Sequence, residues 1–378
     1  MVVMLSASLL ADVADELNFH SDADSTTSQA QRHFMLGPRI PLSCVRQPLQ
    51  RLFPLPPKRS NRFHRASTGR KLAKMAEPTY LTGDKAAIES FIDKFDTFLF
   101  DCDGVIWSGD HLFPKVPETI SLLRKKGKQL VFVTNNSTKS RADYKKKFDK
   151  VGIEAYEEEV FGSSYSAAVY LARIMKLQAP KNKVFVLGET GIEQELQSEG
   201  VPYIGGTDES FRRECTDADF KSIADGSALD KDVAVVLTGL DFHPSYLKYA
   251  LGFAYIRQQG AHFLATNIDS TLPNAGSLFP GAGSTSAPLA TATGQTPLTL
   301  GKPSQAMMDA VEGKFKFDRK RTCMVGDRLN TDIQFGIDGG LGGTLAVLTG
   351  VSQKEEFLAE GASVVPSAYV DQLGDLLG

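Results

Sequence analysis

The sequence lacks the features of a disulfide-stabilised, zinc-stabilised or membrane-spanning protein. It has only four cysteines, Cys44, Cys102, Cys215 and Cys323, and they are scattered without the paired spacing of a zinc site or a disulfide scaffold. No window approaches the roughly 18 to 20 uninterrupted apolar residues that a membrane helix needs. We therefore expect a protein without a membrane span, in a reducing compartment or under no redox constraint.

Asp and Glu are absent from residues 31–76, which contain many Arg and several Ser and Pro and show no helical or strand periodicity. This composition is typical of an organellar transit peptide, so we expect residues 1–80 to be a disordered leader. A basic arm that contacts membranes or nucleic acid is the alternative. Residues 1–30 are acidic, unlike a transit peptide. A start of translation at Met35 would explain this, and a start at Met75 would leave a cytoplasmic protein.

The charge of the rest of the chain argues against a nucleic-acid partner. The formal net charge is −3, but residues 1–76 hold eleven Lys and Arg against five Asp and Glu, a net of +6, so the other 302 residues carry −9. A nucleic-acid-binding domain would need a basic face. We therefore expect a small substrate, with a local cation offsetting any negative charge on it.

Short apolar segments alternate with amphipathic segments after Gly83, the pattern of a Rossmann-like parallel sheet with helices on both faces. We expect three series of strands: 95–100 and 129–134; 184–187, 232–237 and 262–266; and 298–300, 322–326, 344–348 and 363–365. The second series is long enough for a separate α/β unit. Our interpretation is a catalytic core formed by residues 81–179 and 297–378, interrupted by an inserted cap domain at residues 180–296.

Each of four polar motifs follows an expected strand. The strand before the third motif is the one at which the chain is expected to return from the cap to the core. The motifs are Asp101-Cys102-Asp103-Gly104, Thr134-Asn135-Asn136, Gly301-Lys302-Pro303 and Gly326-Asp327 with Asp332 five residues on. Because the carboxyl ends of parallel strands share one edge of a sheet, we expect all four to meet at one crevice. Side chains at i and i+2 point the same way, so Asp101 and Asp103 can serve one site.

This ordered set resembles the four signature motifs of the haloacid-dehalogenase-like phosphohydrolases. The long insertion between the second and third motifs is similar to the large cap of the 4-nitrophenylphosphatase-like branch. Within that branch, Asp-Cys-Asp-Gly-Val-Ile-Trp107, Val-Phe-Val-Thr-Asn-Asn-Ser-Thr-Lys139-Ser-Arg141 and Met-Val-Gly-Asp-Arg-Leu look most like phosphoglycolate phosphatases of photosynthetic cells. The resemblance implies hydrolysis of 2-phosphoglycolate to glycolate in photorespiration and, with the leader, a location in the chloroplast stroma.

The resemblance also implies roles for the motif residues. Asp101 would attack phosphorus to form an aspartyl-phosphate, and Asp103 would act as general acid and base. Asp101, Asp103 and Asp327 would hold Mg²⁺, the Asp103 ligand being usually a backbone carbonyl in this family. Asp332 would support these ligands or add one, and we favour support.

The remaining motif residues would bind the phosphate group. Thr134 would hydrogen-bond phosphoryl oxygens, Lys302 would supply positive charge, and Asn135 and Asn136 would reach the leaving group or brace the loop. Taken singly, each of these residues also has a purely structural explanation as a strand-end hydroxyl, turn former or surface charge.

Substrate choice should come from the cap, where Asp241, His243 and Asp269 lie in segments at expected strand ends. We expect His243 to be a helix-start or core residue rather than a catalyst. Leu272 stands where relatives acting on pyridoxal phosphate tend to have a histidine, which favours a small acid. Another small phosphate ester, such as a sugar phosphate, or a phosphoprotein is the alternative substrate.

A catalytically silent binding protein built on this fold is the alternative from another class of function. Such a protein is expected to have lost a motif residue, whereas Asp101, Asp103, Lys302 and Asp327 are all present. Caps of this size often pair, so we also expect a homodimer. Trp107 and Cys102 should pack beside the site rather than act in it.

Overall fold

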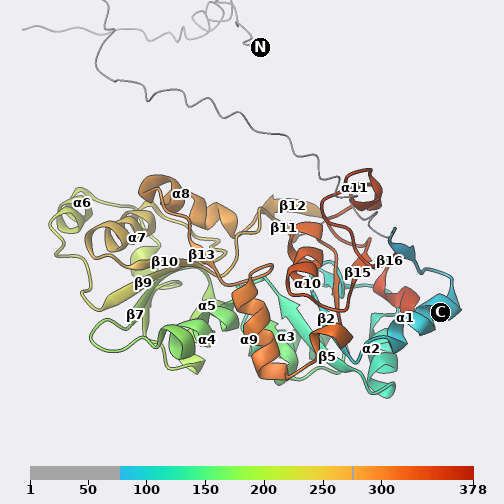
Figure 1. Ribbon diagram of the computed structural model, residues 1–378. Coiled ribbons are helices and arrows are strands. Elements are labelled where there is room, and N and C mark those ends of the chain that lie inside the picture. The colour runs from blue at the N-terminus through green and yellow to red at the C-terminus, as the bar shows by residue number, and fades with distance from the viewer. Residues whose placement is uncertain (1–76, 275) are drawn as a thin grey trace, which may run out of the picture. The chain divides into compact units, whose positions relative to one another are not determined.

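A computed structural model describes residues 77–274 and 276–378 (Figure 1). The expected leader, with its transit peptide and the two alternative starts of translation, lies almost wholly outside these residues. None of the helices in the described part of the chain is both long and apolar enough to cross a membrane.

The core is a seven-stranded sheet in which every neighbouring pair of strands is parallel. In spatial order, the strands are β1 (Thr79–Tyr80), β16 (Ala368–Val370), β15 (Gly343–Val347), β14 (Thr322–Gly326), β2 (Thr97–Phe100), β5 (Gln129–Thr134) and β6 (Val160–Gly162). Strand β2 therefore lies between β14 and β5. In the register, Phe100 stands beside Val325 on one side and Phe132 on the other, so the motifs that follow these three strands emerge together.

Helices lie along the sequence between these strands. They are α1 (Lys85–Asp93), α2 (Val116–Lys125), α3 (Arg141–Lys150), α4 (Ser163–Val169), which continues as a π-helix (Tyr170–Met175), α9 (Gln305–Phe315), a π-helix (Leu329–Ile333) that continues as α10 (Gln334–Asp338), and α11 (Lys354–Leu358). Ser140 and Ser304 cap the starts of α3 and α9 by accepting hydrogen bonds from backbone amides.

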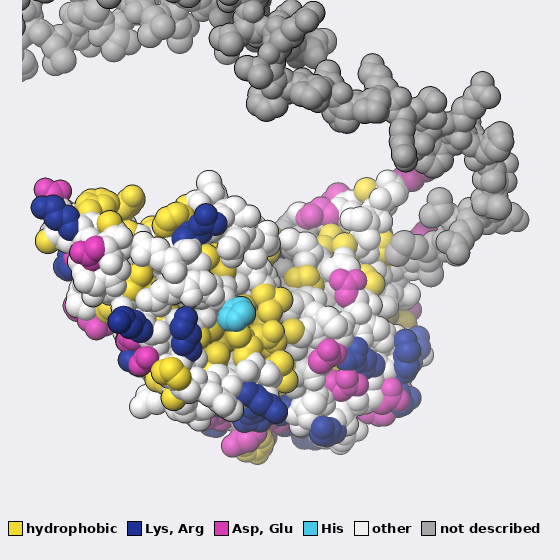
Figure 2. Space-filling model, turned by 60° about the vertical axis from the view of Figure 1, so that its left-hand side comes forward, with side chains coloured by type: hydrophobic (Ala, Val, Ile, Leu, Met, Phe, Trp, Pro, Cys, Tyr) yellow, Lys and Arg dark blue, Asp and Glu magenta, His cyan; other side chains and the backbone are white. Residues whose placement is uncertain are grey.

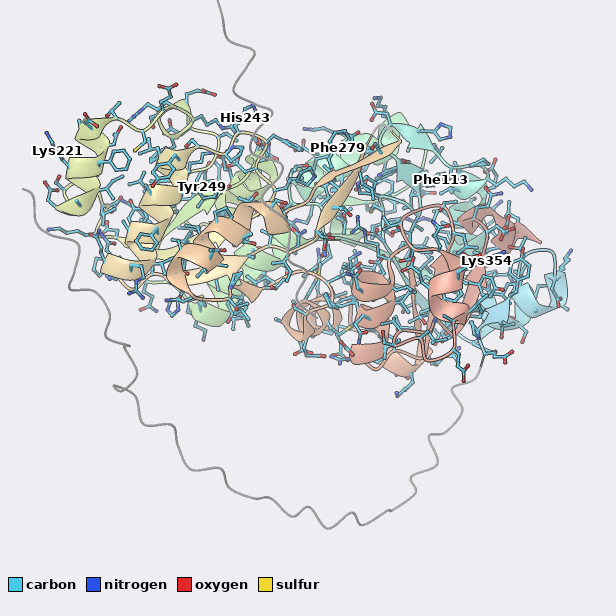
Figure 3. All side chains as sticks on the ribbon, turned by 90° about the horizontal axis from the view of Figure 1, so that it is seen from above. Phe113, Lys221, His243, Tyr249, Phe279 and Lys354 are labelled. Carbon is cyan, nitrogen blue, oxygen red and sulfur yellow. The ribbon has the colours of Figure 1, made fainter. Side chains whose placement is uncertain are left out.

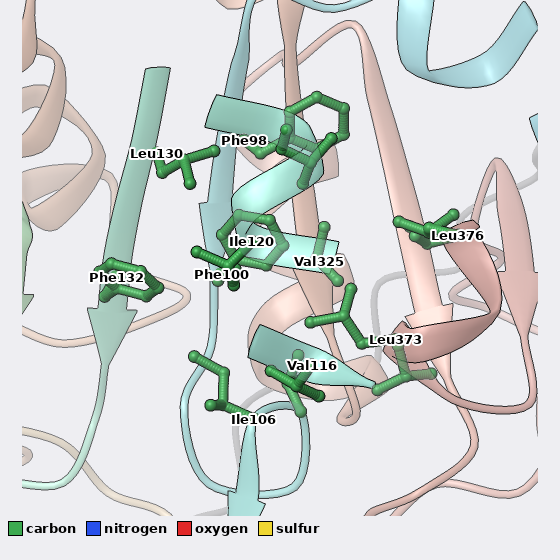
Figure 4. Close-up of a cluster of buried hydrophobic side chains, with 14 of the residues drawn as sticks. Phe98, Phe100, Ile106, Val116, Ile120, Leu130, Phe132, Val325, Leu373 and Leu376 are labelled. Carbon is green, nitrogen blue, oxygen red and sulfur yellow. The ribbon is translucent and has the colours of Figure 1, made fainter. Parts of the chain in front are cut away.

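Alternation along the strands separates the apolar side chains of the sheet into two layers. Phe98 and Phe100 enter one hydrophobic cluster, together with Phe132 and residues of α2 (Figure 4). Leu99, between them in the sequence, enters another cluster on the opposite face, with Met324. Both faces of the sheet are thus covered, as expected for a parallel sheet.

The inserted unit contains a second, five-stranded parallel sheet. Its strands, in spatial order, are β13 (Leu298–Thr299), β10 (His262–Ala265), β9 (Val233–Thr238), β7 (Lys183–Leu187) and β8 (Tyr203–Gly205). Its helices are α5 (Thr190–Ser198), α6 (Asp217–Ala224), α7 (Tyr246–Gln258) and α8 (Gly283–Thr293). The expected fold class, a Rossmann-like core with an inserted α/β cap, is confirmed.

Two short antiparallel hairpins complete the architecture. Strands β3 (Trp107–Ser108) and β4 (His111–Leu112) follow the first motif. Strands β11 (Thr271–Asn274) and β12 (Ser277–Pro280) form the second hairpin. Figure 3 shows Phe279 on this second hairpin, between the cap, marked by His243, and the core, marked by Phe113.

Two expected strands differ from the structure. Residues 298–300 were expected to return to the core, but Leu298 pairs with Leu264 at the edge of the cap sheet. The strand expected at 363–365 lies instead at Ala368–Val370. Short apolar runs do not reveal which sheet they join, because that choice depends on long-range pairing. The residues at which core and cap divide stay a prediction.

Charges of both signs alternate over the face shown in Figure 2. Lys and Arg (dark blue) are interspersed with Asp and Glu (magenta), and the described residues on this face form no continuous field of one sign.

The burial of a leucine should determine how much the free energy of unfolding falls when the leucine is replaced by alanine. Leu123 in α2 is fully buried, whereas Leu358 in α11 is 48% exposed. We predict that Leu123→Ala lowers the free energy of unfolding by about 2–5 kcal/mol, because it leaves a cavity. Leu358→Ala, the matched helical control, should cost less than about 1 kcal/mol. Urea unfolding followed by circular dichroism measures both, and equal losses would contradict the packing described.

Candidate active site

The four motifs meet at one edge of the core sheet, beneath residues of the inserted unit. A cavity of about 50 Å³ lies at this point. It is lined from the core by Asp101, Asp103, Thr134, Asn135, Asn136, Ser137, Lys302, Arg328, Thr331 and Asp332, and from the inserted unit by Leu240, Asn267, Asp269, Thr271, Leu272, Pro273, Gly281 and Ala282. Asp327 lies directly below, within the acidic cluster described next.

Lys302 stands at the centre of the site. Its ammonium group lies 2.8 Å from Asp101 Oδ1 and 2.7 Å from Asp332 Oδ1, and it also donates to the carbonyl of Val133 at 2.8 Å. Burial alone would lower the pKa of Lys302, but the attraction of Asp101 and Asp332 outweighs burial and raises the pKa. These two carboxylates therefore favour the charged form of the lysine beside Asp101.

Asp101, Asp327 and Asp332 form a buried acidic cluster whose oxygen atoms lie within 4.8 Å of one another. Burial raises the pKa of Asp101 well above its usual range and that of Asp327 to about 7, with repulsion from Asp332 as a further cause. Lys302 supplies one positive charge against three carboxylates. An additional cation would offset the remaining negative charge.

The geometry around Asp327 fits a hard divalent cation. Its Oδ1 is buried without a hydrogen-bond partner among the described residues, while Oδ2 accepts from the amide of Val351 at 2.8 Å. Glycines leave room for this carboxylate, since a Cβ built on Gly350 would come within 1.9 Å of Oδ2. Oxygen ligands of this kind are those that Mg²⁺ and Ca²⁺ prefer.

Asp332 contacts protein groups through both of its oxygens, although Oδ1 meets Lys302 only as an ion pair and has no hydrogen-bond partner among the described residues. Oδ2 accepts from the amides of Asp327 and Arg328 at 3.2 and 3.0 Å, and Oδ1 faces Lys302. The side chain thus fixes the loop that carries Asp327. These contacts favour support rather than direct ligation of a cation.

The Asp103 carboxylate points away from the acidic cluster. Trp107 Nε1 donates to its Oδ1 at 2.9 Å, and Asn136 Nδ2 and the Tyr144 hydroxyl donate to its Oδ2 at 3.3 and 3.4 Å. Lys147 Nζ lies 3.8 Å from Oδ1 and 4.0 Å from the centre of the Trp107 ring. The Asp103 carboxylate therefore lines the cavity but does not belong to the acidic cluster of Asp101, Asp327 and Asp332, and a role for Asp103 as a cation ligand stays a prediction.

Asn135 and Thr134 connect the motifs to one another. Asn135 accepts from the amide of Lys302 at 2.8 Å and donates to the Lys302 carbonyl and to Asp269, each at 3.0 Å. The Thr134 hydroxyl lies 3.2 Å from that of Tyr144 and accepts from the amide of Asn136 at 3.1 Å. Of the two roles considered for Asn135, these contacts favour bracing the loop. Asn136 instead holds Asp103.

Three residues in or beside the cavity were given no role from the sequence. Arg328 is nine-tenths buried, and its Nη2 donates to the Thr271 carbonyl at 2.8 Å, which links the core to hairpin β11–β12. Tyr144 and Lys147 belong to α3, a Lys-rich helix whose composition predicts exposure to solvent. Their spacing of three residues places both on one helix face, which is the signal from which a shared environment could be predicted.

The residues expected in the cap divide into two groups. Asp269 lines the cavity, whereas Asp241 lies outside the lining and pairs with the buried Lys248 at 2.7 Å. His243 also lies outside the lining, with 60% of its side chain exposed. Trp107 and Cys102 are fully buried in the core cluster. For Trp107, packing is accompanied by the hydrogen bond to Asp103.

Comparison with known proteins identifies relatives of both halves of the core. Residues 98–202 match a family described as haloacid dehalogenase-like hydrolase, and residues 299–376 match one described as HAD-hydrolase-like. A 4-nitrophenylphosphatase of Schizosaccharomyces pombe is 52% identical, over 76% of this chain and 95% of the relative. The chloroplastic phosphoglycolate phosphatase 1A of Arabidopsis thaliana is 44% identical, over 76% and 78% of the two chains.

A solved structure is similar in both sequence and fold. The glycerol phosphate phosphatase of Mycobacterium tuberculosis, solved in complex with magnesium, is 30% identical and superposes with a TM-score of 0.61. The match covers 75% of this chain and 77% of that one. The same protein has also been solved in complex with calcium.

The space that Gly350 leaves for Asp327 can be tested directly. We predict that Gly350→Ala weakens the binding of a divalent cation about 10–100-fold, because the added methyl group would displace the Asp327 carboxylate. Gly313→Ala is the control, since a Cβ there meets no atom within 4 Å. Calorimetric titration with Mg²⁺ measures both affinities. Unchanged affinity in the Gly350 variant would exclude Asp327 as a ligand.

Proposed function

Because this chain belongs to the haloacid dehalogenase-like hydrolases, in the branch of the 4-nitrophenylphosphatases, we propose that it is a Mg²⁺-dependent phosphatase that converts 2-phosphoglycolate to glycolate. The observation that carries the proposal is the buried Asp101–Lys302–Asp332 cluster at the floor of a small cavity. Membership of the family supports phosphatase chemistry. The choice of 2-phosphoglycolate among phosphate esters is the additional step that we propose.

In the proposed mechanism, Asp101 acts as the nucleophile. Attack of one carboxylate oxygen on phosphorus forms an aspartyl-phosphate and breaks the bond to the alkoxide, which takes a proton from Asp103. Water then attacks phosphorus while Asp103 takes the proton back, which releases phosphate and restores Asp101. Lys302 offsets the repulsion between this carboxylate and the phosphate dianion.

Asp101, the Asp103 carbonyl and Asp327 would hold the cation. When bound, Mg²⁺ neutralises charge on the phosphoryl oxygens and the nucleophile. The protein groups do the remaining positioning: Asp332 holds the loop of Asp327 and Arg328 through two amides, and Trp107 and Asn136 hold Asp103.

The small size of the cavity and a second cation in its lining, Arg328, support 2-phosphoglycolate as the substrate. The cavity of about 50 Å³ is far smaller than the roughly 300–1,000 Å³ of sites for drug-sized ligands. Arg328 lines it, and in the hydrogen bonds of the described residues its side chain donates only through Nη2. Its other N–H groups suit the carboxylate of a short acid. Leu272, also in the lining, supplies no polar group for a larger ring.

Replacing the nucleophile tests the covalent mechanism. We predict that Asp101→Asn reduces the hydrolysis of 4-nitrophenyl phosphate at least about 1,000-fold, because an amide oxygen cannot form the aspartyl-phosphate. Asp110→Asn, at an exposed position, should retain activity within about twofold. Undiminished turnover in the Asp101 variant would exclude this residue as the nucleophile.

A panel of phosphate esters tests the substrate. With Mg²⁺, kcat/KM for 2-phosphoglycolate should exceed that for glycerol 3-phosphate, pyridoxal phosphate and a sugar phosphate. We predict that Arg328→Met lowers kcat/KM for 2-phosphoglycolate about 10–100-fold and that for 4-nitrophenyl phosphate much less, since the latter has no carboxylate. Another ester preferred by tenfold or more would overturn the substrate but leave the phosphatase mechanism intact.

We also propose that residues 31–76 direct the protein to the chloroplast stroma and that the cap pairs in a homodimer. The basic, acid-free composition of residues 31–76 supports the first proposal. Sequencing the N-terminus of the protein isolated from cells checks it. A mature chain that begins at Met75 would favour the cytoplasmic alternative, and one that begins at Met35 would favour a retained basic arm.

A further inference from the structure

A second cavity lies outside the catalytic site, between α4 with its π-helical continuation and α9. Its volume is about 480 Å³, within the usual range of small-molecule sites. The lining is mostly apolar and aromatic and comprises Phe161, Tyr165, Ser166, Val169, Tyr170, Arg173, Ile174, Ala306, Asp309, Ala310, Gly313 and Lys314. The two helices lie side by side where core and cap join (Figure 1).

Lys314 is the unpaired charge in this cavity. Its ammonium nitrogen is buried and has no hydrogen-bond partner among the described residues. The other two charged lining residues each have a counter-ion, since Arg173 pairs with Glu199 and Asp309 with Arg319, both at 2.8 Å. A buried ammonium without a directly bonded anion is costly, and Glu195, Glu158 and Glu157 favour its charge only from a distance, so an anion in direct contact would gain free energy there.

Aromatic rings surround the ammonium group of Lys314. The nitrogen lies 4.8 Å from the ring centre of Tyr165, 5.1 Å from that of Phe315 and 5.9 Å from that of Phe161. Burial, and next the nearby Arg141, lower the pKa of Lys314 to about 8. Arg141 is itself paired with Glu195 at 3.0 Å and stacks on Tyr165, so it does not compete for an anion in the cavity.

We propose that this cavity binds a small carboxylate with a flat apolar body. The carboxylate pairs with Lys314, and the apolar body lies against the aromatic wall and the alanine face of α9. The positive charge of Lys314 favours an anion. The volume and the apolar lining of the cavity favour a flat apolar group attached to that anion. Nothing in the phosphatase mechanism uses Lys314.

The cavity also has a physical connection to the catalytic loops. Ser163 of α4 donates to the carbonyl of Asn135, in the loop after β5, at 2.7 Å. Ser166 of α4 donates to the carbonyl of Leu300, two residues before Lys302, also at 2.7 Å. The opposite wall, α9, begins three residues after Lys302. A ligand between the two helices therefore contacts both supports of the catalytic lysine.

Benzoate is a suitable probe, because it combines a carboxylate with a flat ring. Ligand-observed NMR on the full chain should detect binding, and Lys314→Met should weaken it at least about tenfold, since hydrogen bonds to charged groups are lost. Lys354→Met, at an exposed position in α11, is the control and should bind benzoate as the unmodified protein does. Benzyl alcohol, which has no charge, should bind the Lys314 variant and the unmodified protein equally.

A second variant locates the site independently of charge. Gly313 has open space where a Cβ would stand, so Gly313→Leu extends a side chain into the cavity and also favours the helix. Benzoate binding should be lost although Lys314 remains. Hydrolysis of 4-nitrophenyl phosphate reports that each variant is folded. Absence of benzoate binding to the unmodified protein, or equal binding by either variant, would overturn the proposal.

Discussion

The buried contact of Lys302 with Asp101 and Asp332 is the interaction on which the rest of the site depends. It joins three segments that are far apart in the sequence, with Asp101 and Lys302 separated by 201 residues. Removing one partner from a buried ion pair typically costs about 3–5 kcal/mol. The contact therefore ties together the chain segments at the ends of β14, β2 and β5 and contributes to the charge that a substrate meets.

The inserted unit acts on this cluster through a few close contacts. Asp269 is bonded to Asn135, and Arg328 donates to Thr271 at the base of the β11–β12 hairpin. On the other side, α5 approaches the loop after β5 so closely that a Cβ on Gly191 would lie 2.5 Å from the backbone of Lys139. The core thus supplies the chemistry, and the cap limits the size of what reaches it.

Sequence patterns predicted the core well because its motifs obey a local rule. An apolar strand followed by a polar loop places Asp101, Thr134 and Asp327 at one sheet edge, whatever the intervening segments do. The same rule failed for Leu298, because a two-residue edge strand carries no local sign of its partner.

Residues that act through tertiary contacts were the ones the sequence did not reveal. Arg328 follows a motif residue, but its link to Thr271 depends on the fold of an insertion 57 residues away. Lys147 lies in a helix whose composition suggests solvent, yet it packs on Trp107. In both cases, a long polar side chain is buried against a partner that sequence spacing does not indicate.

The central claim is that the Asp101 carboxylate, held beside Lys302, becomes phosphorylated during turnover. In an Asp103→Asn variant, 4-nitrophenyl phosphate should still react, since 4-nitrophenolate leaves without a proton, whereas hydrolysis of the aspartyl-phosphate lacks its base. Acid quenching, peptic digestion and mass spectrometry then give the decisive measurement. The account predicts phosphate on the peptide that contains Asp101, and release of 4-nitrophenol with no phosphate on that peptide would contradict it.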